Sequence, residues 1–421
     1  MIVCVFEDKM VENLWPLTAT RPVYDLLLGT STLLEKISTH LGQAEELILF
    51  TRPYLEKIVS EKYPELRVNI VPEGKEVLLI NGRAVLNHAI AEHIRNLSLG
   101  QALKTKETVV AVKTLSSNVP ENFWETLSGA VTTDELLRLS KDIIEMPSFS
   151  ISYPWDIISY NETFIESEAR GEPLKENVKG TVLKLGESEV EENVVIDGRK
   201  GPVVLGENVV VESFSKIIGP CFLGNGTRVF SGSVVSRSSF GRVCRIGGEV
   251  EASVFLGFSN KRHYGYLGHS VIGEWVNIGA GTTVSNLKNT YGTVKVNIGG
   301  RRVDTGRQFL GCFIGDHAKT GIGCMISGGV KIGVSSHVYR EAVTDVPSFT
   351  IHTPYKRTEL MIESALQTAD RMMVRRGVDP SHAYLQMLVK VFELTSSERI
   401  ASGVTKGKFS FYNAGTHSAY G

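Results

Sequence analysis

The chain has 421 residues, of which 42% are hydrophobic and 22% charged, as in an ordinary globular protein of two or three domains. Its formal net charge of -1 argues against a broadly basic protein that binds nucleic acid non-specifically. No apolar run approaches the roughly 20 residues of a membrane span. The start MIVCVFEDKM becomes acidic too early for a signal peptide. We therefore expect a cytoplasmic protein with neither a membrane nor a nucleic-acid partner.

The cysteines give no sign of a zinc or redox motif, because none forms a CxxC pair. We expect each to be a small buried residue in a reducing compartment, and we assign no metal ligand. The five are Cys4, Cys221, Cys244, Cys312 and Cys324.

Residues 1–175 alternate short apolar runs with helical patterns. This alternation favours an α/β nucleotidyltransferase-like (Rossmann-like) domain with a mostly parallel sheet, whose binding site lies beyond the carboxyl ends of the strands. The predicted strands are Ile2–Phe6, Glu46–Phe50, Val77–Ile80 and Thr108–Val112. The predicted helices are Thr32–Leu41, Tyr54–Lys62 and Ala89–Leu97.

Residues 176–350 repeat every six positions, and 29 of the 41 glycines fall between Gly180 and Gly333. Neither a helix nor a flat strand has a period of six. Three short strands per coil, each turning one apolar side chain inward, do have it, and glycine supplies the positive-φ corners. We predict a parallel β-helix of hexapeptide repeats, usually left-handed. The predicted inward residues are Ile217, Leu223, Val229, Val235, Ile272, Ile278, Val284, Ile314, Thr320, Ile326, Ile332 and Val338.

Two segments depart from the repeat. Ser285–Arg307 is polar and is predicted to leave a corner as a loop, either functional or a tolerated insertion. Residues 351–421 turn helical, with a first helix over Lys356–Arg376 and a second from Asp379 to about Glu398. We expect a C-terminal helical hairpin that caps the open end of the β-helix, followed by a tail.

The segment Asn260–Asn286 sets polar residues into the repeat and resembles the acetyltransferase segment of a known family. This family comprises sugar-1-phosphate nucleotidyltransferases with a fused left-handed, acyltransferase-type β-helix, and bifunctional GlmU is its best-known type. The start Pro16–Pro22, PLTATRP, resembles the family's P-L-T-x-T-R-P-K. The resemblance covers most of residues 1–350. The residues in register in the acetyltransferase segment are His263, Tyr266, Gly268, Ile272, Gly273, Asn277, Ile278, Gly279, Ala280, Gly281, Thr282 and Asn286.

The resemblance implies N-acetyl transfer from acetyl-CoA to an amino-sugar phosphate. His263 would remove the amine proton, because histidine titrates near neutral pH, and Asn286 would orient the imidazole or the substrate. Tyr266 and Asn277 would contact the sugar phosphate. The family's acetyl site lies between subunits, so a homotrimer is implied. Backbone N–H groups suited to a carbonyl oxygen or a pantetheine amide belong to Gly279, Ala280 and Gly281.

The same segment departs from the family pattern in its charges. Glu251 falls near a family lysine, and His269 replaces a family aspartate. Positive charge for a phosphate or for coenzyme A would come from Lys261, Arg262, Lys288 and Lys295, or these would be solvated loop charges. His263 itself has an alternative reading as a polar residue at a corner. The candidates for the substrate-phosphate arginine are Arg228, Arg237 and Arg262.

The N-terminal domain departs further. Nucleotidyl transfer needs backbone N–H groups and Mg²⁺, a candidate cofactor here, around the triphosphate. Glu7–Asn13 reads EDKMVEN, with no glycine, and Asn81-Gly82-Arg83 replaces the family's N-G-D, whose aspartate holds the metal. Arg83 is predicted either to bind a phosphate or to pair with Glu7 or Asp8. Arg21 is predicted to bind a phosphate or to be a buried structural arginine.

Three hypotheses follow. The protein is an acetyltransferase of amino-sugar metabolism with its site on the β-helix, a sugar-1-phosphate nucleotidyltransferase with rewired contacts, or a non-catalytic sugar-nucleotide-binding or regulatory protein.

Overall fold

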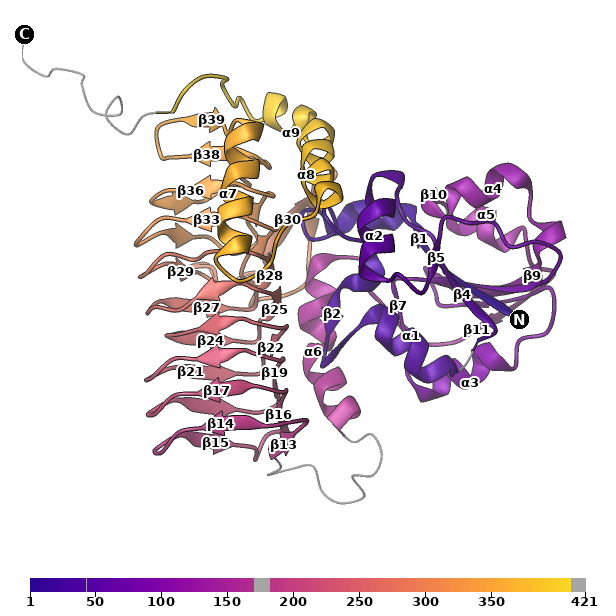
Figure 1. Cartoon of the computed structure of the whole chain (residues 1–421), viewed down its shortest axis with the longest axis horizontal. Helices are drawn as coiled ribbons and strands as arrows, with labels where there is room; N and C mark the ends of the chain where they lie inside the picture. Colours follow the sequence, from indigo (N-terminus) through magenta and orange to yellow (C-terminus); the bar gives the residue numbers. More distant parts are fainter. Residues whose placement is uncertain (43, 170–181, 410–421) are drawn as a thin grey trace, which may run out of the picture. The chain divides into compact units, whose positions relative to one another are not determined.

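The computed structural model describes residues 1–42, 44–169 and 182–409. The chain divides into two compact units, Met1–Val178 and Lys179–Gly421 (Figure 1). The predicted boundary at residues 175 and 176 and the end of the predicted tail lie outside the described residues. Within the described ranges, no helix combines the length and apolarity needed to cross a bilayer.

The first unit is built on a mostly parallel sheet of order β11-β8-β9-β6-β1-β4-β5, with β10 beside β1. The central strand β1 has all seven residues buried, as expected for a strand covered on both faces. Only the pairings of β9 with β6 and β8 are antiparallel. The four predicted strands are confirmed. The bounds are β1 Ile2–Asp8, β4 Glu46–Leu49, β5 Arg67–Val68, β6 Glu76–Asn81, β8 Gln101–Lys104, β9 Val109–Leu115, β10 Ser128–Val131 and β11 Asp142–Glu145.

Helices connect these strands, and the three predicted ones are present. Helix α1 begins after Thr32, whose side chain forms a capping box with Glu35. Two small antiparallel pairs, β2–β3 and β7–β12, complete the unit. The helices are α1 Leu33–Leu41, α2 Glu56–Lys62, α3 His88–Arg95, α4 Glu121–Thr126, α5 Thr133–Leu137 and α6 Pro154–Ala169. The short strands are β2 Leu27–Leu28, β3 Ser31–Thr32, β7 Ala84–Val85 and β12 Phe149–Ser150.

The second unit is a parallel β-helix with three faces, and every predicted inward residue is buried in it. The first face consists of β13 Val182–Lys184, β16 Val203–Leu205, β19 Cys221–Leu223, β22 Ser239–Phe240, β25 Val254–Gly257, β28 Val271–Glu274, β32 Phe313–Ile314 and β35 Lys331–Ile332. The second face begins with β14 Ser188–Val190, β17 Val209–Val211, β20 Arg228–Val229, β23 Arg245–Ile246 and β26 Asn260–Lys261. The third face begins with β15 Val195–Asp197, β18 Lys216–Ile218, β21 Val234–Ser236, β24 Glu249–Glu251 and β27 Tyr266–Gly268.

The second and third faces, like the first, continue into the C-terminal coils. Single bridges from Asn260 to Asn277 and from Asn277 to Lys319 extend the second face. Its further strands are β33 Lys319–Thr320, β36 His337–Val338 and β38 Thr350–His352. The third face continues with β29 Thr283–Val284, β34 Met325–Ile326 and β37 Glu341–Ala342. All five cysteines are buried and free, and four of them lie in the β-helix core.

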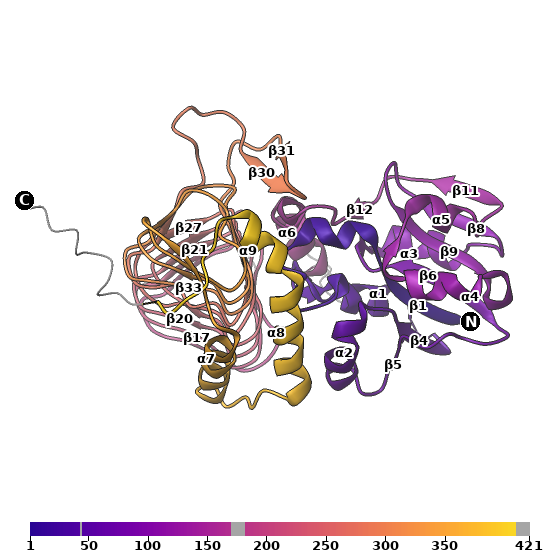
Figure 2. The same ribbon diagram turned by 90° about the horizontal axis from the view of Figure 1, so that it is seen from above.

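The predicted loop is confirmed. After β29 the chain leaves the β-helix and forms an antiparallel hairpin of β30 Lys295–Ile298 and β31 Arg301–Asp304. Figure 2 shows this hairpin outside the stacked coils. The repeat resumes at Phe313, which pairs with Val271 of the preceding coil. The insertion therefore leaves the stacking intact.

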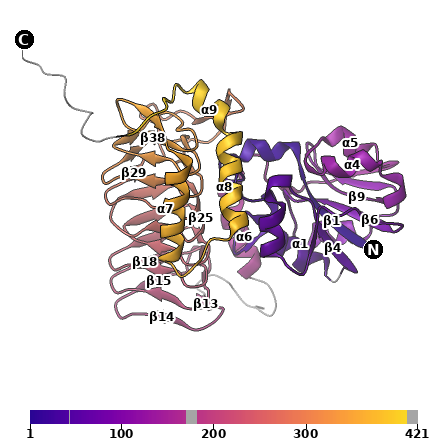
Figure 3. The same ribbon diagram turned by 45° about the horizontal axis from the view of Figure 1, so that its top comes forward.

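The C-terminal helices differ from the prediction in two respects. Residues 356–361 are not helical, because β39 Arg357–Glu359 pairs antiparallel with β38. The helices are α7 Ile362–Val374, α8 His382–Leu394 and α9 Ser396–Ala401. Helix α7 runs along the side of the β-helix rather than across its end, as Figures 1 and 3 show. Met373 of α7 packs against Phe258 and Trp275, which fixes it there.

Candidate functional site

The predicted base lies at an exposed corner of the β-helix. His263 stands between β26 on the second face and β27 on the third, and both it and Arg262 are exposed. The Arg262 guanidinium carbon lies 4.4 Å from the centre of the Phe230 ring. Asn277, one coil further on, is half-buried, and its Oδ1 accepts a hydrogen bond of 2.7 Å from Asn260. These side chains are therefore held near one another by the stacking of coils.

His263, Arg262 and Asn277 line a groove of about 840 Å³ between the second face and helix α7. We call it the arginine groove. One wall carries Arg228 and Arg245 of the β-helix, with Lys319 beyond them. The other wall comes from α7 and the residues that follow it. That wall contributes Arg371, Arg375 and Arg376. The one carboxylate among all the residues that line the groove is Glu212.

Tyr266 and Asn286 do not line this groove but form a second cluster on the third face. The Tyr266 hydroxyl donates to Glu251 Oε2 at 3.0 Å and accepts from Asn286 Nδ2 at 2.6 Å. Arg237 donates to the other Glu251 oxygen at 2.7 Å. The charge reversal at Glu251 is therefore balanced locally by Arg237, and the structure separates the predicted site residues into two groups.

His269 belongs to this second cluster. Its Nδ1 lies 3.0 Å from Asn286 Nδ2, so the amide donates and Nδ1 accepts. Its ring stacks on Phe309, with ring centres 5.6 Å apart. Burial lowers the pKa of His269 to about 4, against a smaller opposing effect of Glu251. His269 is thus a neutral hydrogen-bonding residue at neutral pH.

The other predicted contacts are used within the chain. The N–H of Gly279 donates to Thr320 Oγ1 at 2.9 Å, and that of Gly281 donates to the Tyr264 carbonyl at 2.9 Å. These two N–H groups therefore stabilise the coil instead of facing a ligand, and Ala280 lies between them. The exposed Lys288 donates to the carbonyl of Thr293 at 3.1 Å, within the loop.

Lys261 is a functional candidate that sequence reasoning misplaced. It pairs in register with the buried Ile246 and is itself only 1% exposed, so its side chain points into the β-helix. Its Nζ donates to the carbonyls of Gly247 and His263, at 2.7 and 2.9 Å. Burial lowers the pKa of Lys261 to about 8, while Glu249 opposes this. The ammonium group therefore braces the corner that carries His263.

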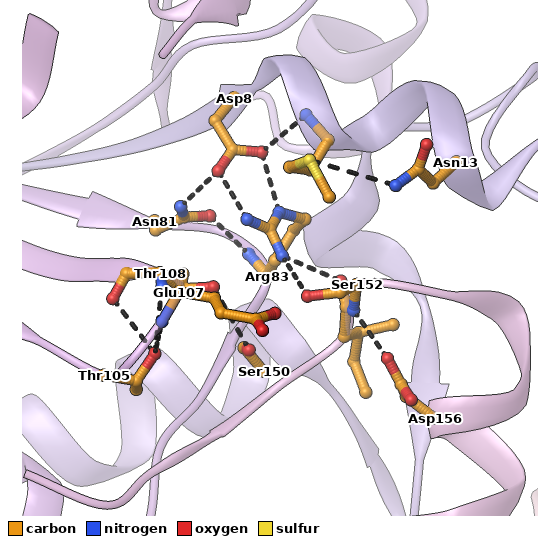
Figure 4. A network of polar contacts seen from close by, with 12 residues as sticks. Asp8, Asn13, Asn81, Arg83, Thr105, Glu107, Thr108, Ser150, Ser152 and Asp156 are labelled. Carbon is orange, nitrogen blue, oxygen red and sulfur yellow. Dashed lines mark hydrogen bonds and ion pairs between the residues drawn. The ribbon is translucent and has the colours of Figure 1, made fainter. Parts of the chain in front are cut away.

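In the first unit, Arg83 forms a buried ion pair with Asp8 (Figure 4). Arg83 is 1% exposed and donates from Nε and Nη2 to the two Asp8 oxygens, at 2.7 and 2.6 Å. Its Nη1 donates to Ile151 O and to Ser152 Oγ. The predicted pairing with Asp8 is thus the arrangement found, and Arg83 does not present its guanidinium to a substrate phosphate.

The neighbouring carboxylate, Glu7, is also paired with an arginine of the same unit. Glu7 is fully buried and accepts from Arg52 Nε at 3.1 Å and from the Val23 N–H at 2.8 Å. Arg21 is 6% exposed, and its carbonyl accepts from Arg52 at 2.7 Å. Arg21 is therefore a buried residue next to the ion pair of Glu7 and Arg52.

The residues at this position do not fit a Mg²⁺ site. Both oxygens of Asp8 are taken by Arg83, and Asn81 also donates to one of them at 2.8 Å. Across the part of the chain that the structure describes, no group of three or more His, Cys, Asp or Glu side chains is arranged to hold a metal.

Parts of the arginine groove were readable from sequence and parts were not. Arg228, Arg245 and Lys319 each precede a residue that faces the core, so their outward position follows from the repeat. The same register would have placed Lys261 inward. Arg371, Arg375 and Arg376 reach the groove only because α7 folds back along the β-helix.

Comparisons with known proteins relate this chain to sugar nucleotidyltransferases and to bifunctional GlmU proteins. A family model described as sugar nucleotidyl transferase matches residues 3–171. A bifunctional sugar-1-phosphate nucleotidylyltransferase/acetyltransferase of Sulfurisphaera tokodaii is 34% identical over 51% of this chain and 51% of its own length. The bifunctional protein GlmU of Methanocaldococcus jannaschii is 31% identical over 50% of this chain and 48% of its own. The chain thus spans about half the length of these two relatives.

One further relative is covered almost completely. The bifunctional protein GlmU of Methanococcus vannielii is 30% identical to this chain over 83% of the chain and 96% of its own length. Both units described above therefore have counterparts in a single relative, and the chain belongs to the family of bifunctional GlmU proteins.

Proposed function

We propose that this protein transfers an acetyl group from acetyl-CoA to the amino group of a sugar phosphate, with His263 as the general base. The observation that carries the proposal is that His263 and Asn277 line the same arginine-rich groove. Both substrates bear phosphate, which guanidinium groups bind with directed hydrogen bonds. The acetyltransferase named among the relatives supports the same reaction class.

The thioester supplies an activated acyl carbon, and the protein must supply a proton acceptor. As the amine nitrogen attacks this carbon, the carbon–sulfur bond breaks and coenzyme A leaves as a thiolate, which takes up the proton from His263. The exposed imidazole of His263 accepts the proton that the nitrogen loses and thus acts as the general base. Lys261 holds the carbonyl of His263 and thereby fixes the corner.

The two groups of residues divide the remaining work in this proposal. Arg262 and Asn277 contact the phosphate-bearing substrate in the groove. Tyr266 and Asn286 shape the neighbouring third face through their bonds to Glu251 and His269. Residues 279–281 form the next corner, beside that of His263, and we place the pantetheine arm against their outer surface.

Thiol release from acetyl-CoA, measured with a panel of amino-sugar phosphates, tests the proposal. Replacing His263 by Ala is expected to lower kcat by about 10²- to 10⁴-fold, the usual contribution of a general base. The matched control is His93→Ala, an exposed histidine of α3 in the other unit. Absence of thiol release with every acceptor, or full activity of His263→Ala, would refute the assignment.

We also propose a cytoplasmic homotrimer in which a neighbouring subunit covers the His263 corner. Large apolar side chains are exposed along this edge, namely Tyr264 at 71%, Ile322 at 82% and Met325 at 62%. Light scattering should give three times the chain mass of 46.2 kDa. A monomer would contradict this arrangement.

Nucleotidyl transfer is the second candidate, supported by the family match over residues 3–171. The Asp8–Arg83 ion pair predicts weak or absent activity of the usual metal-dependent kind. Pyrophosphate release from a panel of nucleoside triphosphates and sugar-1-phosphates decides this. If neither reaction occurs and a sugar nucleotide raises the melting temperature, the non-catalytic binding function is supported instead.

A further inference from the structure

The arginine groove holds more positive charge than its lining neutralises. Six arginines and Lys319 line it, against the single carboxylate of Glu212. Glu212 is already paired with Arg228, whose Nε lies 2.6 Å from Oε1. Among the described residues, no ion pair involves any of the groove's other five arginines. A groove with this excess of charge attracts a polyanion.

The β-helix wall of the groove is an ordered column. Arg228, Arg245, Asn260, Asn277 and Lys319 are register partners on successive coils. Neighbouring parallel strands lie about 4.8 Å apart, so the column presents two guanidinium groups, two amides and an ammonium group at regular steps. Such a row fits a ligand with adjacent phosphates followed by hydrogen-bonding groups.

The α7 wall brings like charges towards this column. Burial lowers the pKa of Arg245, and the charges of Arg228, Arg262 and Arg375 lower it further. Burial, Arg245 and Arg375 likewise lower the pKa of Arg376. Guanidinium groups from both walls therefore repel one another, and a bound anion would relieve this repulsion.

We propose that the arginine groove binds the diphosphate group of a nucleotide, held between Arg228 and Arg245 of the β-helix and Arg371 and Arg375 of the α7 wall. Arginine suits this role because its planar fork contacts a phosphate through two parallel hydrogen bonds. Two sources carry this chemistry. The first is the 3′-phospho-ADP end of coenzyme A, which carries a diphosphate and rests on the proposed function. The second is the nucleoside diphosphate of a sugar nucleotide, which does not rest on it.

The helix end by itself does not explain the groove. Arg371 and Arg375 lie in and just after the last turn of α7, where cations favourably oppose the helix dipole. That effect gives no reason for Arg228, Arg245 and Arg262, which stand on the β-helix and face the same space. The convergence of two walls is what points to a ligand.

Calorimetric titration of the full chain with coenzyme A and with UDP, at low and moderate salt, tests the proposal. Arg245→Gln and Arg375→Gln should each weaken binding at least 10-fold. The control Arg301→Gln, an exposed arginine of the β30–β31 hairpin, should leave it unchanged. Because Arg375 is exposed, its variant tests the groove without disturbing the core.

The outcomes separate the sources. Tighter binding of coenzyme A identifies the acetyl donor, and tighter binding of UDP identifies a sugar nucleotide. Absence of binding by both, or equal affinity of the groove variants and wild type, overturns the proposal. Nucleotide binding without thiol release would refute only the acetyl transfer, whereas thiol release with unaltered nucleotide affinity in the groove variants would refute only this assignment.

Discussion

The buried ammonium group of Lys261 should make the stability of the β-helix depend on pH. Its pKa is lowered from 10.5 to about 8, chiefly by burial. The difference corresponds to roughly 3 kcal/mol at about 1.4 kcal/mol per pKa unit. Between the two values the unfolded chain binds one more proton than the folded chain, so stability rises with pH. The gain is complete above the unfolded pKa and is lost as pH falls through about 8.

Lys261→Met keeps the length of the side chain and removes the charge. The variant leaves the carbonyls of Gly247 and His263 without this donor, at a cost of about 1–3 kcal/mol for each, and also removes the desolvation cost. These effects oppose each other at pH 7. The decisive quantity is therefore the difference between wild type and variant as a function of pH, because only the wild type has the titrating lysine.

Pulsed thiol labelling in urea measures this difference within one unit at a time. Cys221, Cys244, Cys312 and Cys324 are buried in the β-helix and report its unfolding, while Cys4 reports the first unit as an internal control. From pH 7 to 10 the wild type should gain roughly 2 to 3 kcal/mol relative to Lys261→Met, with no change at Cys4. Parallel pH profiles of the two proteins would refute the reasoning.

Three further predictions concern other parts of the chain. Arg83→Ala should destabilise the first unit by about 3–5 kcal/mol, because it leaves the Asp8 carboxylate buried without its ion-pair partner, and Asp8→Leu/Arg83→Met should recover most of this loss. Labelling of Cys4 measures the free energy of unfolding of this unit, and a loss below about 1 kcal/mol would contradict the buried pair. His269 should titrate near pH 4 by NMR, and Phe309→Ala should raise the pKa of His269 by exposing the imidazole ring. Titration of His269 in the wild type near pH 6.5 would disprove its burial. Met373→Ala should loosen α7, because it removes the contact with Phe258 and Trp275, and should weaken nucleotide binding in the arginine groove. Unchanged nucleotide affinity together with unchanged hydrogen exchange in α7 would count against this contact.

The sequence was most informative where a local pattern determines the position of each residue. In the β-helix, each coil repeats the same local rule, so Ile272, Ile278 and Ile314 could be placed inside from spacing alone. The alternation of apolar strands and amphipathic helices predicted the first unit for the same reason. The family pattern from His263 to Asn286 was also readable, because its residues lie on consecutive coils.

The tertiary structure decided what spacing does not encode. Only the fold shows that His263 and Asn277 face the arginine groove. On another face, Tyr266 donates to Glu251 and accepts from Asn286. At a corner the chain passes from one face of the β-helix to the next within a few residues, so residues close in sequence can lie on different surfaces. The pairing of Asp8 with Arg83 joins positions 75 residues apart, and sequence reasoning left it as one of several alternatives.

The charge at the groove shows the same division. The sequence by itself determined an outward column with Arg228 and Arg245, because each precedes a core residue in the repeat. It did not determine that Arg371 and Arg375 face that column, since this depends on Met373 packing against Phe258 and Trp275. The six-residue period is a local property of the chain and can be recognised in the sequence. The approach of α7 to the charged column of the β-helix depends on long-range packing, which only the folded structure specifies.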